Sequence, residues 1–137
     1  MSEANVEASS RPAIVGRAVM LLYATLGLGV LYAVLKFPAL VQHMPVLYVL
    51  FVWAVVFGTM GFLIHEIGAR QNWARVASLI LFVAGLPFAI PPLFHALIVA
   101  PVYGLLGLLQ LLGMAIALVM LFLGASNEWY RNPKAAK

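Results

Sequence analysis

The chain alternates long apolar runs with short polar segments. Each run is about 20 residues long and carries almost no charge. A hydrocarbon core ~30 Å thick is crossed by about 20 helical residues, so each run is long enough to span a membrane. We therefore predict four transmembrane helices, at about 13–35, 46–67, 73–90 and 103–124.

Breaker and cap residues mark the ends of these helices. The first helix is expected to end before Pro38, and the second at Gly68, a candidate C-cap. Asn72 is a candidate N-cap for the third helix. The double proline Pro91-Pro92 is expected to stop that helix, because proline lacks a backbone donor and disfavours helix in the residue before it. The segments 37–45 and 91–102 are then apolar connectors at the membrane interface.

The predicted organisation is a single all-α domain, a bundle of four transmembrane helices. Residues 13–125 form this domain. Residues 1–12, which are polar and mixed in charge, read as a disordered cytoplasmic tail, and residues 126–137 read as a second cytoplasmic tail.

Composition supports a membrane protein. The chain has 137 residues, of which 65% are hydrophobic and 9% charged, with a mean hydropathy of +1.06. A soluble domain is about half apolar and about a quarter charged. The lipid bilayer is therefore the first predicted partner.

Few reactive side chains are present. The sequence has no cysteine and no aspartate, and its acids are Glu3, Glu7, Glu66 and Glu128. This excludes thiolate metal sites, Ser-His-Asp triads and two-metal carboxylate clusters. We accordingly predict no enzymatic activity, no cofactor and no metal.

The basic residues predict the orientation of the chain. Every lysine and arginine except Lys36 falls on the side of the two termini and of the turn between the second and third helices. By the positive-inside rule, both termini and this turn are expected to face the cytoplasm. Charges that flank apolar runs in this way do not form a nucleic-acid-binding face, so no nucleic acid is expected as a partner.

Small residues at helical spacing predict the contact faces, because they allow helices to approach closely in lipid. Thr25, Gly29 and Ala33 recur every four residues in the first helix. Gln110 is the most informative residue of the interior, since a buried amide is costly without a partner. The candidate buried polar or packing residues are Gln110, His65, Glu66, Thr59, Gly58, Gly61 and Gly107.

The segment HEIGARQNWAR, residues 65–75, contains a partial zinc-protease motif. HExxH needs a second histidine four residues after the first, and here that position is Ala69. A structural role is favoured, in which Glu66 pairs with Arg70 across one helical turn. Two further histidines lie in the connectors without a third metal ligand. The predicted interfacial residues are Trp73, Arg75, Trp129, Tyr130, His43 and His95.

The GARQ sequence at 68–71, the Asn-Trp-Ala-Arg step at 72–75 and the Trp-Tyr-Arg ending at 129–131 resemble a group of uncharacterised bacterial four-helix inner-membrane proteins. The resemblance implies the same layout and a place in a bacterial inner membrane, and it brings no activity with it.

The favoured function is that of an accessory or scaffold subunit, which packs against itself as a homo-oligomer or against a larger membrane complex. One alternative is an oligomeric channel or transporter for a small or neutral solute. Another is a haem- or quinone-associated accessory protein.

Overall fold

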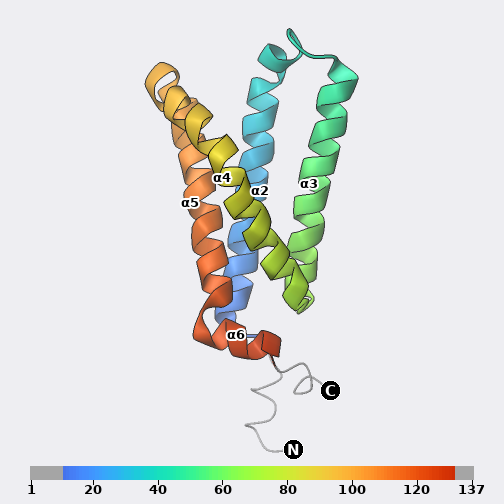
Figure 1. Cartoon of the computed structure of the whole chain (residues 1–137), viewed down its shortest axis with the longest axis vertical. Helices are drawn as coiled ribbons and strands as arrows, with labels where there is room; N and C mark the ends of the chain where they lie inside the picture. Colours follow the sequence, from blue (N-terminus) through green and yellow to red (C-terminus); the bar gives the residue numbers. More distant parts are fainter. Residues whose placement is uncertain (1–10, 132–137) are drawn as a thin grey trace, which may run out of the picture.

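The computed structural model describes residues 11–131, and this part of the chain is all-helical (Figure 1). Four of its helices are long and apolar enough to cross a membrane, which confirms the all-α class and the four long apolar helices. The helices are α2 Ala13–Leu40, α3 Val46–Gly68, α4 Asn72–Val99, α5 Pro101–Phe122 and the short α6 Gly124–Arg131.

The long helices form a bundle in which α2 packs along α5 and α3 lies beside α2. Helix α4 crosses the bundle diagonally, from α3 at its first residues to α5 at its last (Figure 1). Helix α6 lies across one end, close to the beginning of α2. We call this the α6 end of the bundle, and the other the opposite end.

Small residues bring α2 and α5 together. Thr25 is buried, and its hydroxyl donates to the carbonyl of Leu22, three residues earlier, at 2.8 Å. A Cβ at Gly113 of α5 would lie 2.5 Å from Cγ2 of Thr25, so glycine is needed there for this approach. Gly29 and Ala33 are also buried. The predicted contact face of the first helix is therefore confirmed.

Two helices run further than the sequence predicted. Helix α2 continues through Pro38 to Leu40, and α4 continues through Pro91 and Pro92 to Val99. The expectation that the double proline stops α4 was wrong. In lipid an interrupted helix leaves backbone groups without water to bond, so proline is tolerated within transmembrane helices.

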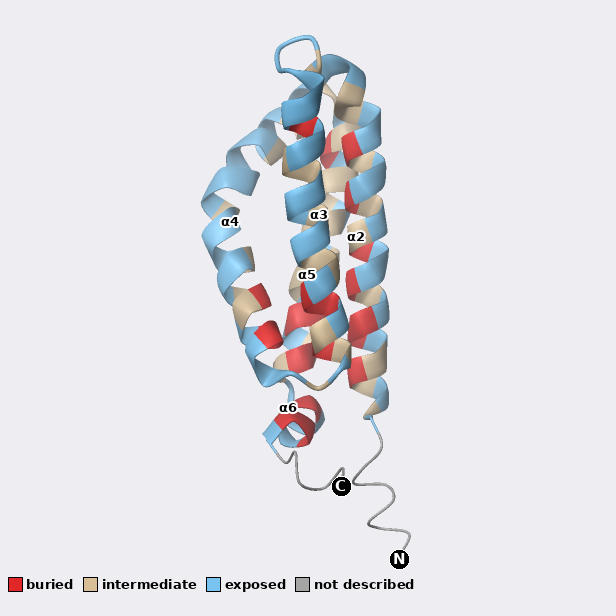
Figure 2. Ribbon diagram, turned by 90° about the vertical axis from the view of Figure 1, so that its right-hand side faces the viewer, coloured by how far each residue is buried: buried red, intermediate tan, exposed pale blue. Residues whose placement is uncertain are grey.

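The prolines shape α4 instead of ending it. Figure 2 shows α4 curved away from α5 in its middle. Pro87 lies near the midpoint of this helix, and the Pro91-Pro92 pair follows about one turn later. Each proline removes one backbone hydrogen bond and crowds the carbonyl four residues earlier, which bends a helix. The curve leaves space between α4 and its neighbours.

Helices α4 and α5 meet again at the opposite end. They are joined by Ala100 alone, and Pro101 opens α5 at a position where its missing N–H costs nothing. A Cβ at Gly104 would lie 2.6 Å from both N and Cα of Leu97, so the two backbones are in close contact.

The hydrophobic core lies at the α6 end (Figure 2). Towards the opposite end few side chains are buried, and large apolar ones such as Leu47 and Ile98 are more than four-fifths exposed. Such exposure is expected of a surface that faces lipid. The core residues are Val15, Ala18, Val19, Leu22, Leu63, Ile64, Ile67, Ala74, Ala117, Leu118, Leu121, Trp129 and Tyr130.

The chain after α5 is not wholly a tail. Residues 124–131 form α6, whose Ser126, Trp129 and Tyr130 are buried. This corrects the prediction of a tail from residue 126. The predicted tail segments 1–10 and 132–137 lie outside the described residues.

Candidate functional site

Arg75, in the first turn of α4, is a buried arginine at the α6 end. Its Nη1 donates to the carbonyl of Leu121 at 3.0 Å, and its Nη2 donates to Oδ1 of Asn127 at 2.9 Å. Its Nε donates to Oδ1 of Asn72 at 2.6 Å. Leu121 lies in the last turn of α5, where carbonyls lack intrahelical donors, so Arg75 caps that helix and complements its dipole.

Aromatic faces surround the Arg75 guanidinium. Its central carbon lies 4.8 Å from the ring centroid of Phe122 and 4.5 Å from that of Tyr130. Desolvated cation–π contacts of this kind are worth about 2 kcal/mol. The charge is therefore held between the end of α5 and α6.

Arg70 caps the end of α6 in the same way that Arg75 caps the end of α5. Its Nε donates to the carbonyl of Trp129 at 2.8 Å, and its guanidinium lies 4.8 Å from the Trp129 ring centroid. Arg70 also has φ of 68°, the left-handed conformation that commonly ends a helix. The turn after α3 is thus shaped so that this side chain reaches the last turn of α6.

Tyr130 completes the cluster from the side of α6. Its hydroxyl donates to the carbonyl of Ile67, in the last turn of α3, at 2.7 Å. Burial raises the pKa of Tyr130 to about 12, against the smaller opposing effects of the Arg75 and Arg11 charges. Its ring meets that of Trp129 edge to face at 4.9 Å. The C-terminal turns of α3, α5 and α6 each receive a side-chain donor.

The segment HEIGARQNWAR therefore has a structural role within this chain. Two of its details differ from prediction: Asn72 accepts from Arg75 instead of capping α4, and Gly68 is helical while Arg70 takes the left-handed conformation. The pairing of Glu66 with Arg70 stays a prediction. Sequence reasoning did not link these arginines to residues 124–131, because that segment was interpreted as a tail.

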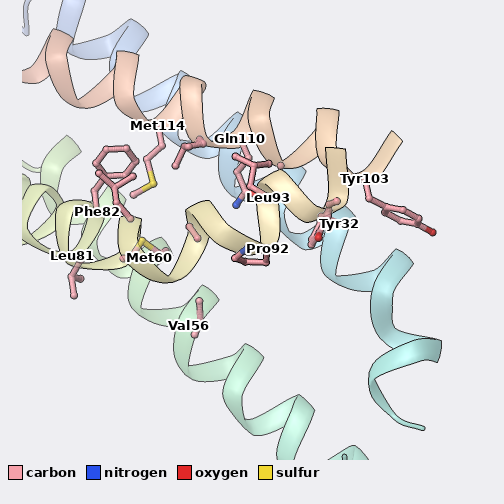
Figure 3. Close-up of a pocket in the computed structure, with 16 residues that line it drawn as sticks. Tyr32, Val56, Met60, Leu81, Phe82, Pro92, Leu93, Tyr103, Gln110 and Met114 are labelled. Atoms are coloured by element: carbon pink, nitrogen blue, oxygen red, sulfur yellow. The ribbon is translucent and has the colours of Figure 1, made fainter. Parts of the chain in front are cut away.

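A second feature is a cavity of about 410 Å³ inside the bundle. Its volume falls within the range of ligand sites, about 300–1,000 Å³. Figure 3 shows Tyr32 and Tyr103 at one end, Phe82 and Met114 at the other, and Gln110 between them. The other lining residues are apolar: Val56, Met60, Leu81, Gly85, Leu86, Ala89, Pro92, Leu93, Ala96, Gly107 and Leu111.

The cavity opens between α3 and α4. Its lining residues on α2 and α5 are at least partly covered, whereas those that are exposed all lie on α3 or α4. These positions fall within apolar helices long enough to span a membrane. The exposed lining residues are Val56, Leu81, Gly85, Ala89 and Pro92.

Gln110 brings an amide to the wall of this cavity. A Cβ at Gly29 would lie 2.5 Å from its Nε2, so its amide fills the space that a side chain at Gly29 would take. The side-chain hydrogen bonds found within residues 11–131 do not include this amide. Gln110 was predicted to be informative, and the structure places it against α2 at the wall of the cavity.

A lysine lies beside the tyrosine end of the cavity. Nζ of Lys36 is 4.2 Å from the ring centroid of Tyr103 and 6.0 Å from that of Tyr32. The two rings meet edge to face at 6.2 Å. The sequence did not predict this cluster, although Lys36 was already singled out as the basic residue set apart from the others.

Several predicted residues lie elsewhere than expected. Gly58, Thr59 and His65 are exposed on α3 within this chain, and none of them lines the cavity with Gln110, so their role in packing stays a prediction. Gly61 and Glu66 are half-buried. Spacing shows which residues share a face of a helix, but not whether that face turns inward.

The predicted interfacial residues divide into two groups. Arg75, Trp129 and Tyr130 are buried within the chain, and their position at a membrane interface stays a prediction. Trp73 is about half exposed, with its ring 6.1 Å from that of Phe62. His43 is exposed in the turn after α2, and His95 is exposed on α4, not in a connector.

Within residues 11–131, no group of three or more histidine or acidic residues is placed to hold a metal ion. Comparison with protein-family models, curated proteins and solved structures finds no match for the chain. The described residues form an apolar cavity with an amide in its wall and a lysine beside one end.

Proposed function

We propose that the protein is a non-enzymatic membrane protein that takes a lipid-soluble molecule from the bilayer into the cavity between α3, α4 and α5. The observation that carries this proposal is the position of the opening. The exposed lining residues lie midway along apolar helices, so a ligand would enter from lipid and not from water. The apolar lining with a few polar groups is typical of sites for such molecules.

Photolabelling tests this function. The purified protein in neutral phosphatidylcholine nanodiscs is irradiated with diazirine analogues of palmitic acid and of methyl palmitate, and labelled residues are identified by mass spectrometry. We expect saturable labelling of lining residues such as Leu93 by at least one probe, with competition by unlabelled ligand. Labelling that does not saturate, or that spreads evenly over lipid-facing residues, contradicts the proposal.

A pair of variants on α4 supplies the control. Ala89 lies at the opening, whereas Ala84 is exposed on the same helix outside the lining. Ala89→Trp is expected to block saturable labelling, and Ala84→Trp to leave it unchanged. Equal behaviour of the two variants would show that labelling is not governed by the opening.

The orientation of the bundle is part of the proposal. Arg11, Arg17, Arg70, Arg75 and Arg131 belong to the α6 end, which is expected to face the cytoplasm of a bacterial inner membrane. Because the chain has no cysteine, the labelling of a single introduced cysteine reports the position of that residue alone. A membrane-impermeant maleimide should label Gln42→Cys, in the α2–α3 turn, in spheroplasts, and Ala125→Cys only after lysis. The reverse labelling pattern would show that the bundle has the opposite orientation in the membrane.

A role as an accessory subunit remains the second candidate. Ala54 and Gly58 are exposed one helical turn apart on α3, and a Cβ at Gly58 would meet nothing within 4 Å. Such a pair suits close approach of another helix. Gly58→Ile should then reduce the mass of the complex extracted in mild detergent, while Gly27→Ile, at an equally open position of α2, should not.

A further inference from the structure

We infer that the molecule bound in the cavity is an acidic lipid, with its anionic head at Lys36 and its hydrocarbon chain along α5. This inference rests on the proposed function and adds the chemical class of the ligand. It follows from the charges around Lys36, from the shape of the cavity and from the order of polar and apolar residues along it.

Lys36 has no acidic counterpart at its end of the bundle. Among residues 11–131 the acids are Glu66, in the last turn of α3, and Glu128, in α6, and both belong to the α6 end. The contacts of the Lys36 ammonium are the faces of Tyr103 and Tyr32. Aromatic rings attract a cation but leave its charge uncompensated. An anion at this position would supply the missing charge.

Lys36 is also joined to the cavity. The ammonium lies 4.2 Å from the ring centroid of Tyr103 and 6.0 Å from that of Tyr32. Both tyrosines line the cavity, so Lys36 lies beside its tyrosine end. Figure 3 shows these tyrosines at that end, and Phe82 and Met114 at the other. A ligand with one charged end and one apolar end would match this order.

The length of the cavity favours a chain. Tyr103 and Met114 are 11 positions apart in α5, which corresponds to about 16 Å along the helix. A volume of about 410 Å³ spread over that length is narrow, and suits a hydrocarbon chain better than a compact ring system. Beyond Gln110 the cavity is lined by apolar residues, and the hydrocarbon chain of the ligand would end there.

The two diazirine probes separate this inference from the proposed function. Palmitic acid and methyl palmitate have the same chain, and only the acid carries a charge. We expect the acid to label the lining residues at about tenfold lower concentration than the ester, as for a charge-assisted hydrogen bond in a partly desolvated site. Equal saturable labelling by both probes would overturn the acidic head and keep the proposed function. Failure of both would overturn the function itself.

Variants of Lys36 show whether this charge is responsible. Lys36→Gln should reduce labelling by the acid to the level of the ester, and Lys36→Arg should retain the preference for the acid. Arg17→Gln removes the same charge from an exposed position near the α6 end of α2, and should have no effect. If the acid keeps its advantage in Lys36→Gln, the head does not lie at Lys36.

The acidic lipid can be a free fatty acid or an anionic phospholipid, and competition distinguishes them. If phosphatidylglycerol added to the nanodiscs displaces the acid probe while phosphatidylcholine does not, the site takes the phospholipid. If unlabelled palmitate displaces it and phosphatidylglycerol does not, the site takes the fatty acid. Displacement by phosphatidylcholine to the same extent would overturn the preference for an acidic head.

Discussion

The two ends of the bundle are stabilised differently. At the α6 end, Arg70, Arg75 and Tyr130 donate to carbonyls in the last turns of three helices, over a closed apolar core. Towards the opposite end, α4 curves away from its neighbours and leaves a cavity, and Gly104 brings it back to α5. At the first end the helix-end carbonyls receive donors, although the Nε1 atom of Trp129 is buried there without a hydrogen-bond partner. Near the second end, no acidic residue among residues 11–131 lies beside the charge of Lys36. We infer that the first end holds the bundle together and that the second can bind.

Substitution of Arg75 should have the largest effect on stability. Arg75→Ala removes three hydrogen bonds from a charged donor and leaves the Leu121 carbonyl buried. We expect a loss of about 3–5 kcal/mol, because such bonds contribute about 1.5–3 kcal/mol each and are not fully additive. Thermal unfolding in mild detergent measures it.

Arg75→Lys provides the control for that measurement. Lysine keeps the charge but lacks the planar fork that reaches three acceptors, so it should recover only part of the loss. If Arg75→Ala unfolds at the same temperature as the wild type, the α6 end does not depend on this cluster, and the contrast between the two ends fails.

Gly104 tests the close contact between α4 and α5 at the opposite end. Gly104→Ala places a Cβ against the backbone of Leu97, which cannot move aside as a flexible side chain would. Overpacking of this kind costs about 1–3 kcal/mol. Gly27→Ala, in open space, is the matched control and should change the melting temperature little or raise it slightly. Equal effects would mean that α4 and α5 do not approach as closely as described.

Tyr130 should contribute less than Arg75. Tyr130→Phe removes one neutral hydrogen bond, to the carbonyl of Ile67, at a cost of about 1 kcal/mol. Because the pKa of Tyr130 is raised to about 12 in the folded chain, from about 10 when unfolded, folding favours its protonated form. The stability that the protonated Tyr130 contributes is fully present below pH 10 and is lost as the pH rises towards 12.

Unfolding of wild type and Tyr130→Phe at several alkaline pH values checks this. The stability difference between the two proteins should shrink between pH 10 and pH 12, since phenylalanine cannot titrate. A difference that stays constant over this range would show that the Tyr130 hydroxyl is not desolvated at the α6 end.

The features that sequence predicts well here are those set by the apolar runs. Four runs of sufficient length predict four long helices, and the Thr25, Gly29 and Ala33 spacing predicts the face of α2 that meets α5. Both follow from local composition and from the 3.6-residue period. Gly58 and Gly61, three residues apart on α3, do not mark an inner face in the same way, since Gly58 is exposed.

The features that the sequence did not predict depend on contacts between segments far apart in the chain, or on the lipid around the helices. Helix α6 has a short, polar sequence. It is held by hydrogen bonds from Arg70 and Arg75, which lie more than 50 residues earlier in the chain. The passage of α4 through Pro91-Pro92 depends on the high cost of free backbone groups in lipid. The cavity follows from the curve of α4, so it was not predicted either.

Gly29 offers the smallest expected change in stability and the most direct test of Gln110. A Cβ at Gly29 would meet the Nε2 atom of Gln110, the end of a flexible side chain that can turn away, so Gly29→Ala should cost less than about 1 kcal/mol, below Gly104→Ala. The displaced amide has the cavity beside it, and labelling by the acid probe should fall although the bundle stays folded. In the double variant Gly29→Ala/Gln110→Ala the clash is absent, and both the small loss of stability and the labelling should recover, a coupling that a double-mutant cycle measures. Additive effects would show that Gly29 and Gln110 do not interact, and that the Gln110 amide is not held against α2 at the wall of the cavity.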